Sequence, residues 1–278
     1  MGEVVIEFQS VSKQFEDGTV AVDNFSFTFP SHQATVLVGS SGCGKTTILR
    51  MINRMIEPST GSIQIDSIDI KARDTVELRR SIGYVLQAGG LLPHRTVVDN
   101  IATVPMLNGV SKRKARQDAS ELLDKVGLDR SLGNRYPRQL SGGQQQRVGV
   151  ARALASNPNI LLMDEPFGAV DPIVRAELQI ELNRLQRDLS KTVVFVTHDI
   201  DEAFALADQI VILRKGGTIA QVGTPLEILA NPADEFVSSF IGADKGRRQL
   251  FRSLQPNGST LLVDGDGRPA GFLDEGPL

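Results

Sequence analysis

One short segment constrains this chain more than any other: it follows the pattern glycine, four residues, glycine, lysine, then serine or threonine. The apolar run 35–38 before it predicts a strand, and apolar residues at helical spacing follow it. Glycines at these places let backbone N–H groups wrap phosphate oxygens, and the following helix presents its positive end to them. The pattern predicts a phosphate-binding loop, with a structural glycine turn as the alternative. Its residues are Gly39, Ser40, Ser41, Gly42, Cys43, Gly44, Lys45 and Thr46.

Four side chains carry the chemistry that such a loop implies. Lys45 would supply positive charge to the β and γ phosphates, and the Thr46 hydroxyl would ligate Mg²⁺. The apolar run 160–163 predicts a buried strand that ends in Asp164 and Glu165, and ligands bind at such strand ends in parallel sheets. We expect Asp164 to hold Mg²⁺ and Glu165 to orient or deprotonate an attacking water.

The composition fits a globular, cytoplasmic protein. The 278 residues include 30 basic and 33 acidic side chains, and the net charge of −3 argues against a general nucleic-acid binder. The single cysteine, Cys43, excludes an intrachain disulfide and fits a reducing compartment. No apolar run approaches the roughly 18 residues of a membrane span, and the first residues lack a secretory signal. We therefore expect a soluble chain.

Buried apolar strands that alternate with helical patterns predict an α/β fold with a mostly parallel sheet. The stretch from 96 to about 155 is helical, including a helix over 111–126 that Gly127 would stop, and we interpret it as an insertion. Apolar spacing extends the helix after the phosphate loop to Ile56, and Val174, Leu178, Leu185 and Leu189 form a further helix stripe. Strands are also expected at 4–8, 25–29, 63–65, 68–70, 193–196, 210–213 and 218–222, and the last two would form a hairpin.

A second helix start is also built to bind an anion. Ser141 precedes a predicted helix at its N-cap position, and two glycines follow it. A serine hydroxyl, glycine N–H groups and the helix dipole together favour negative charge. The residues of this segment are Leu140, Ser141, Gly142, Gly143 and Gln144.

With this segment, the chain resembles the nucleotide-binding subunit of an ABC transporter, whose signature motif has this sequence. The resemblance covers Val4 to about Gly242. It implies a P-loop NTPase fold, in which a RecA-like, mostly parallel sheet is joined by an N-terminal antiparallel β subdomain. It also implies an inserted α-helical subdomain at about 88–155, within an ATP-binding cassette at 1–242.

The resemblance also assigns roles to individual residues. The signature would act on the ATP of a second copy of the chain, and Asp171 would couple the two copies. Gln87 would sense Mg²⁺ and water, and His198 would contact the γ-phosphate, which makes Glu165, His198 and Gln87 the expected catalytic set. Phe15 would stack on adenine, with an ordinary core aromatic as the alternative. ATP would be bound by Phe15, the loop 39–46 and Thr47, and Mg²⁺ by Thr46, Gln87 and Asp164.

Several stretches are similar to one branch of the family, the ATPases of importers for quaternary amines and compatible solutes such as glycine betaine, choline, carnitine and proline. They are Gly83–Gln87, Leu91–Val97, Tyr136–Gln139, Gln144–Ala153 and Phe167–Pro172. Members of this branch often end in paired regulatory CBS modules, for which residues 243–278 are too few. Strands are expected there at 261–263 and 271–273, as a remnant of one such module or as part of a partly ordered tail.

The expected function is therefore ATP hydrolysis that powers an ABC importer. Expected partners are a second copy, transmembrane permease subunits and, indirectly, a solute-binding protein, with no nucleic acid. The chain would lie in the cytoplasm, held to the inner face of the membrane through the permease. Alternatives are an importer ATPase for another small solute such as an amino acid, a soluble ABC ATPase acting on nucleic acid, and a non-catalytic regulatory module.

Overall fold

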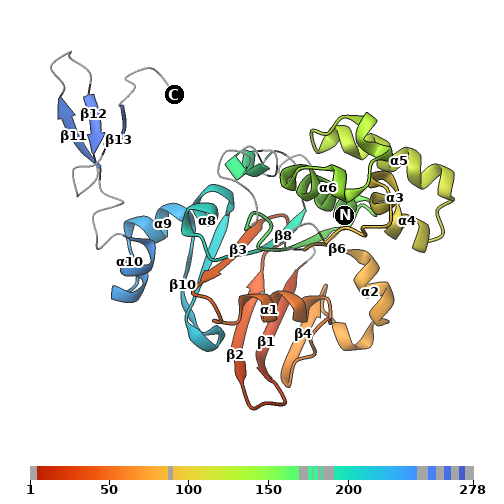
Figure 1. Ribbon diagram of the computed structural model, residues 1–278. Helices are drawn as coiled ribbons and strands as arrows, with labels where there is room; N and C mark the ends of the chain where they lie inside the picture. Colours follow the sequence, from red (N-terminus) through yellow and green to blue (C-terminus); the bar gives the residue numbers. More distant parts are fainter. Residues whose placement is uncertain are drawn as a thin grey trace.

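In the residues that it describes, the computed structural model shows an α/β fold with three sheets (Figure 1). It describes residues 5–86, 90–168, 175–176, 178–180, 182, 184, 191–242, 250–254, 260–263 and 269–272. Within this part of the chain, no helix is both long and apolar enough to cross a membrane.

The central sheet has six strands in the order β10-β9-β3-β8-β7-β6. All neighbours are parallel except β10, which pairs antiparallel with β9 and forms the predicted hairpin. Every residue of β3, β7 and β8 is buried, as expected for apolar strands covered on both faces. The mostly parallel core predicted from the sequence is confirmed. The strands are β3 (Ala34–Gly39), β6 (Ile82–Val85), β7 (Ile160–Asp164), β8 (Thr192–Thr197), β9 (Gln209–Leu213) and β10 (Ile219–Gly223).

A second, antiparallel sheet is formed near the N-terminus in the order β2-β1-β4-β5. Phe8, Phe25 and Phe29 lie in its buried face, and the Phe8 ring meets the other two edge to face. The same apolar cluster contains residues of α1 (Lys45–Ile52) and of the central sheet. The helix therefore packs between the two sheets. The strands are β1 (Ile6–Gln14), β2 (Val20–Phe29), β4 (Thr60–Ile65) and β5 (Ile68–Asp69).

The expected extension of α1 to Ile56 is wrong. The helix ends at Ile52, and Arg54 has a positive φ of 55°. The backbone N–H groups of Met55 and Ile56 both donate to the Arg50 carbonyl, so the chain turns sharply there. Met55 is half exposed. The prediction failed because the apolar spacing continues through Met55 and Ile56, beyond the turn, and no residue type in the sequence marked the turn clearly.

Helices fill the chain between β6 and β7, in the region where the sequence predicts an insertion (Figure 1). The helix predicted over 111–126 is α5: Ser111 accepts a hydrogen bond from the Lys114 N–H at its start, and Gly127 follows its end with φ of 66°. The helices are α3 (Val97–Ile101), α4 (Thr103–Leu107), α5 (Lys112–Lys125) and α6 (Gly142–Leu154), and α2 (Thr75–Ser81) precedes β6.

The remaining elements follow β7. Leu178, from the predicted helix stripe, is buried, and Val174, Leu185 and Leu189 lie outside the described residues. Beyond 250, a three-stranded antiparallel sheet includes the two predicted strands and one that was not predicted, β11. The elements are α8 (Ile200–Leu206), α9 (Pro225–Ala230), α10 (Glu235–Ile241), β11 (Phe251–Leu254), β12 (Thr260–Val263) and β13 (Pro269–Phe272).

Candidate active site

The predicted phosphate loop runs from the end of β3 to the start of α1. Gly44 is the N-cap of α1 with φ of 107°, and a Cβ there would lie 2.5 Å from the Ala21 carbonyl oxygen. A Cβ on Gly39 would lie 2.5 Å from the Leu213 carbonyl oxygen. Both positions therefore require glycine. Gly44 has a positive φ, and at Gly39 and Gly44 the neighbouring carbonyl oxygen leaves no room for a Cβ. No side chain caps α1, so no capping side chain occupies the first N–H groups of the helix.

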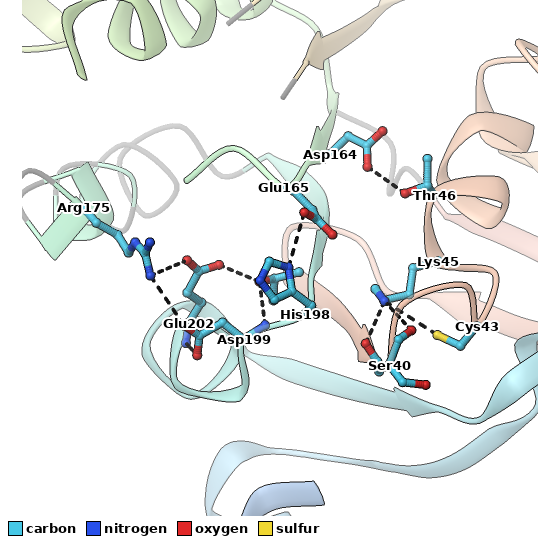
Figure 2. A network of polar contacts seen from close by, with 12 residues as sticks. Ser40, Cys43, Lys45, Thr46, Asp164, Glu165, Arg175, His198, Asp199 and Glu202 are labelled. Atoms are coloured by element: carbon cyan, nitrogen blue, oxygen red, sulfur yellow. Dashed lines mark hydrogen bonds and ion pairs between the residues drawn. The ribbon is translucent and has the colours of Figure 1, made fainter. Parts of the chain in front are cut away.

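Lys45 folds back over this loop and is buried (Figure 2). Its Nζ donates to the carbonyl oxygens of Gly39, at 2.7 Å, and Ser40, at 3.0 Å, and lies 3.7 Å from Cys43 Sγ. A buried ammonium is costly unless it is hydrogen-bonded, and these carbonyls meet that need. The loop therefore holds a concentrated positive charge at the N-terminus of α1.

The hydroxyl of Thr46 meets the carboxylate at the end of β7. Thr46 Oγ1 donates to Asp164 Oδ1 at 2.9 Å, which brings together two expected Mg²⁺ ligands that are 118 residues apart. Two partners that the sequence reasoning missed hold the other oxygen: Arg50 Nη2 at 3.2 Å and the Tyr84 hydroxyl at 3.1 Å. Burial above all, and then the nearby Asp164 carboxylate, raises the pKa of Tyr84 to about 12, so the phenol stays a donor.

Glu165 and His198 face each other beside the loop (Figure 2). Glu165 Oε2 lies 3.3 Å from His198 Nδ1. The Glu165 N–H donates to the Val196 carbonyl, and its φ of 43° is uncommon for a residue with a side chain. His198 directly follows β8, and its side chain is 57% exposed. The ends of two neighbouring parallel strands thus bring a carboxylate and an imidazole together.

A cleft of about 320 Å³ opens over the loop. Glu165 lines it, so the carboxylate faces the space in front of the loop. Ala21 of β2 also lines the cleft, which shows that the β1–β2 hairpin reaches it. The remaining lining residues are Ser41, Gly42, Gly44, Lys45, Thr46 and Thr47.

Phe15 lies on that same hairpin, where the β1–β2 turn begins. Its side chain is exposed, and Lys13 Nζ lies 5.3 Å from the centroid of its ring. An ordinary core aromatic, the alternative reading of this residue, is therefore wrong. Phe15 does not line the cleft over the loop.

The segment 140–144 lies at the start of α6 and does not line the cleft over the phosphate loop. Ser141 is the predicted N-cap: its Oγ accepts from the Gln144 N–H at 3.3 Å, and Gln144 Oε1 accepts from the Ser141 N–H at 3.0 Å. This reciprocal pair is a capping box. Gln87 and Asp171, two further predicted site residues, lie outside the described residues.

Behind His198, the sequence reasoning missed a set of polar residues that meet one another. Thr197 Oγ1 donates to Glu202 Oε2 at 2.6 Å, and Arg175 Nη1 lies 3.7 Å from Glu202 Oε1. Burial raises the pKa of the Glu202 carboxyl. The available signal was the position of Glu202, four residues after His198. Because α8 begins between the two residues, Glu202 lies in the first turn of that helix, close to His198.

A glycine-rich loop between a buried strand and a helix, with carboxylates at the end of a strand of the same sheet, defines the class of P-loop nucleotide-binding proteins. The sequence model of the ABC transporter family matches residues 22–168, which include the loop, the segment 140–144 and both carboxylates. The chain belongs to the ABC transporter family.

Relatives with known roles share much of the sequence. The choline transport ATP-binding protein OpuBA of Bacillus subtilis (strain 168) is 53% identical over 91% of this chain, which spans 65% of that protein. The osmoprotectant import ATP-binding protein OsmV of Salmonella typhimurium (strain LT2) is 50% identical to this chain, and the matched region covers 97% of this chain and 79% of OsmV. This chain thus spans less than two thirds of OpuBA.

A solved structure confirms the fold class. The dimeric structure of MJ0796, a bacterial ABC transporter cassette, matches 79% of this chain and 98% of its own length, with a TM-score of 0.72 and 35% identity. The same protein has also been solved as a dimer in a post-hydrolysis state bound to ADP and Pi, with a TM-score of 0.72 and 34% identity.

Proposed function

We propose that this chain hydrolyses ATP to power an ABC importer for quaternary amines and compatible solutes. The observation that carries the proposal is the cleft over the phosphate loop, where Lys45, Thr46 and Glu165 meet. Lys45 offers charge to phosphate oxygens, and Glu165, with His198 3.3 Å away, would act as the base for a water that attacks the γ-phosphate. The proposed cassette covers residues 1–242, with its helical subdomain at about 88–155.

The residues beside the loop fit Mg²⁺. A hard cation of this kind prefers oxygen ligands, and the Thr46 hydroxyl and the Asp164 carboxylate are oxygen donors held 2.9 Å apart. Among the described residues, no three His, Cys, Asp or Glu side chains converge as a metal cage. Thr46 and Asp164 would therefore share the ion with phosphate oxygens and with Gln87, and the ion would neutralise charge on those phosphates.

The second helix start supports assembly of two copies. The segment 140–144 lies at a helix N-terminus but does not line the chain's own cleft, so its N–H groups suit a phosphate that arrives from elsewhere. We propose that it acts on the ATP held by a second copy and that Asp171 couples the copies. The dimeric structure of MJ0796 supports the assembly of two copies.

The solute class rests on the named relatives. OpuBA is a choline transport protein and OsmV an osmoprotectant import protein, at 53% and 50% identity. We propose that the chain serves transport of similar solutes through transmembrane permease subunits fed by a solute-binding protein. It would then lie at the cytoplasmic face of the membrane.

Two measurements test the proposal. Purified chain should hydrolyse ATP only with Mg²⁺, and cells that lack the chain should lose uptake of labelled glycine betaine, choline or carnitine. Uptake restored by the wild type but not by Glu165→Gln supports the importer. Loss of amino-acid uptake alone would indicate another solute, and ATPase activity that responds only to nucleic acid would contradict the importer.

A further inference from the structure

Polar contacts fix the turn that carries His198 (Figure 2). Thr197, the last residue of β8, receives a hydrogen bond at Oγ1 from the Asp199 N–H at 3.0 Å and donates from the same atom to Glu202 Oε2 at 2.6 Å. His198 stands between Thr197 and Asp199. The hydroxyl of Thr197 therefore ties both sides of His198 to one carboxylate on α8.

The helix cap alone does not explain Glu202. Asp199 already caps α8, because its Oδ1 accepts from the N–H groups of Asp201, at 2.8 Å, and Glu202, at 3.4 Å. The side chain of Glu202 is 7% exposed, and burial of a carboxylate is costly unless its oxygens are paired. One of those oxygens is given to Thr197, the residue before His198. The buried carboxylate of Glu202 therefore serves to hold this turn in place.

Arg175 joins this arrangement from the chain between β7 and β8. Its Nη1 lies 3.6 Å from Asp199 Oδ2 and 3.7 Å from Glu202 Oε1, so one guanidinium spans both carboxylates. Arg175 opposes the effect of burial on the pKa of Glu202 and favours the charged carboxylate that Thr197 donates to. A movement of Arg175 would therefore also move His198, because Glu202 contacts Arg175 on one side and Thr197 on the other.

We propose that Glu202, held by Arg175 and acting through Thr197, is a positioning residue that keeps His198 against Glu165. The inference rests on the proposed ATP hydrolysis and adds to it a residue that does not touch the nucleotide. Small displacements of a catalytic group reduce rates strongly, so loss of this contact should lower kcat far more than it raises KM.

The first test is a double-mutant cycle on ATP hydrolysis by the purified full chain. Glu202→Gln leaves one acceptor oxygen, so the side chain cannot serve both Thr197 and Arg175 as the carboxylate does. The change alone should lower kcat about tenfold and leave KM for ATP within about twofold. In a His198→Ala background, the same change should cause no further loss, because the side chain that Glu202 positions is absent. An equal loss of kcat in both backgrounds would overturn the inference.

A matched pair at Thr197 covers the case in which Glu202→Gln unfolds the chain. Thr197→Val keeps the shape and removes the hydroxyl, and Thr197→Ser keeps the hydroxyl. We expect the first variant to lose kcat as Glu202→Gln does and the second to stay close to the wild type. Equal activity of the two variants would contradict the role of this hydroxyl.

A spectroscopic test does not depend on turnover. The chain has three histidines, His32, His94 and His198, so the imidazole NMR signals can be assigned with two single substitutions. Glu202→Gln should shift or broaden the His198 signals. Asp208→Asn is the control, since its Oδ2 accepts a hydrogen bond from the Ala34 N–H at 2.7 Å, at the other end of β3 from the loop.

The kinetic and the spectroscopic tests together separate the inference from the proposed function. A wild-type chain that hydrolyses no ATP refutes the proposed function and the kinetic role of Glu202 with it. Active wild type with His198 signals that Glu202→Gln leaves unchanged refutes only the positioning of His198.

Discussion

Two helix starts in this chain suit an anion, and they differ in how their N–H groups are used. At α1, the N-cap is Gly44, no side chain caps the helix, and buried Lys45 adds positive charge. At α6, Ser141 and Gln144 satisfy each other's N–H groups in a capping box. The start of α1 is open to a ligand held by the same chain. At the start of α6 the capping box already pairs these N–H groups, so a ligand there would compete with the cap.

The largest effect should come from the α1 side of this comparison, at Glu165. Glu165→Gln removes the proposed base and keeps the size of the side chain, so turnover should fall about a hundredfold to ten-thousandfold while ATP binding persists. The variant should also favour a closed dimer with MgATP. Steady-state hydrolysis and size-exclusion chromatography with ATP check both outcomes. Turnover like that of the wild type would contradict the role of Glu165.

Lys45→Ala tests the loop itself. Loss of a charged donor to phosphate should weaken ATP binding by about ten- to a hundredfold, because hydrogen bonds to charged groups are among the stronger ones. Equilibrium titration with a fluorescent ATP analogue measures this. Lys125→Ala, at the end of α5, is a control that removes one positive charge far from the loop in sequence. Equal affinities of the two variants would contradict the assignment.

Ser141→Ala should separate the two helix starts. The variant loses an N-cap, which costs about 1 kcal/mol of stability, and it loses the proposed contact to the second copy's ATP. We therefore expect ATP affinity close to the wild type but slower turnover. Urea denaturation, ATP titration and hydrolysis measure the three quantities. A fall in ATP affinity as large as that of Lys45→Ala would show that the starts of α1 and α6 bind the same nucleotide within one chain, which contradicts the account.

The smallest effect concerns Tyr84, which supports Asp164 on the α1 side. Its pKa of about 12 in the folded chain lies above the ordinary value of 10.0, so the folded state disfavours the phenolate. The stability that the neutral phenol contributes is complete below pH 10 and is lost as pH rises from about 10 to 12. Tyr84→Phe should lack this part of the alkaline loss. Denaturation of both chains across this pH range measures the difference, and parallel curves would contradict it.

The sequence predicted those parts of the site whose signals are local. The loop 39–46 and the carboxylates after β7 could be located because their pattern and their flanking strands lie together in the chain. The contacts of Arg50 and Tyr84 with Asp164 could not, because they join elements far apart in sequence. Glu202 lies only five residues from its partner Thr197 and was missed because its spacing from His198 was not used. The end of α1 was missed because apolar spacing continued past the turn at Arg54. The roles of Gln87 and Asp171 remain predictions.

The central claim is that two copies complete each other's sites, and a mixture of two impaired chains tests it directly. Lys45→Ala keeps an intact segment 140–144, and Ser141→Ala keeps an intact phosphate loop. In a mixed dimer, one of the two composite sites is intact, so an equal mixture should recover about a quarter of wild-type turnover. A mixture whose rate is only the average of the two variants measured alone would contradict the claim.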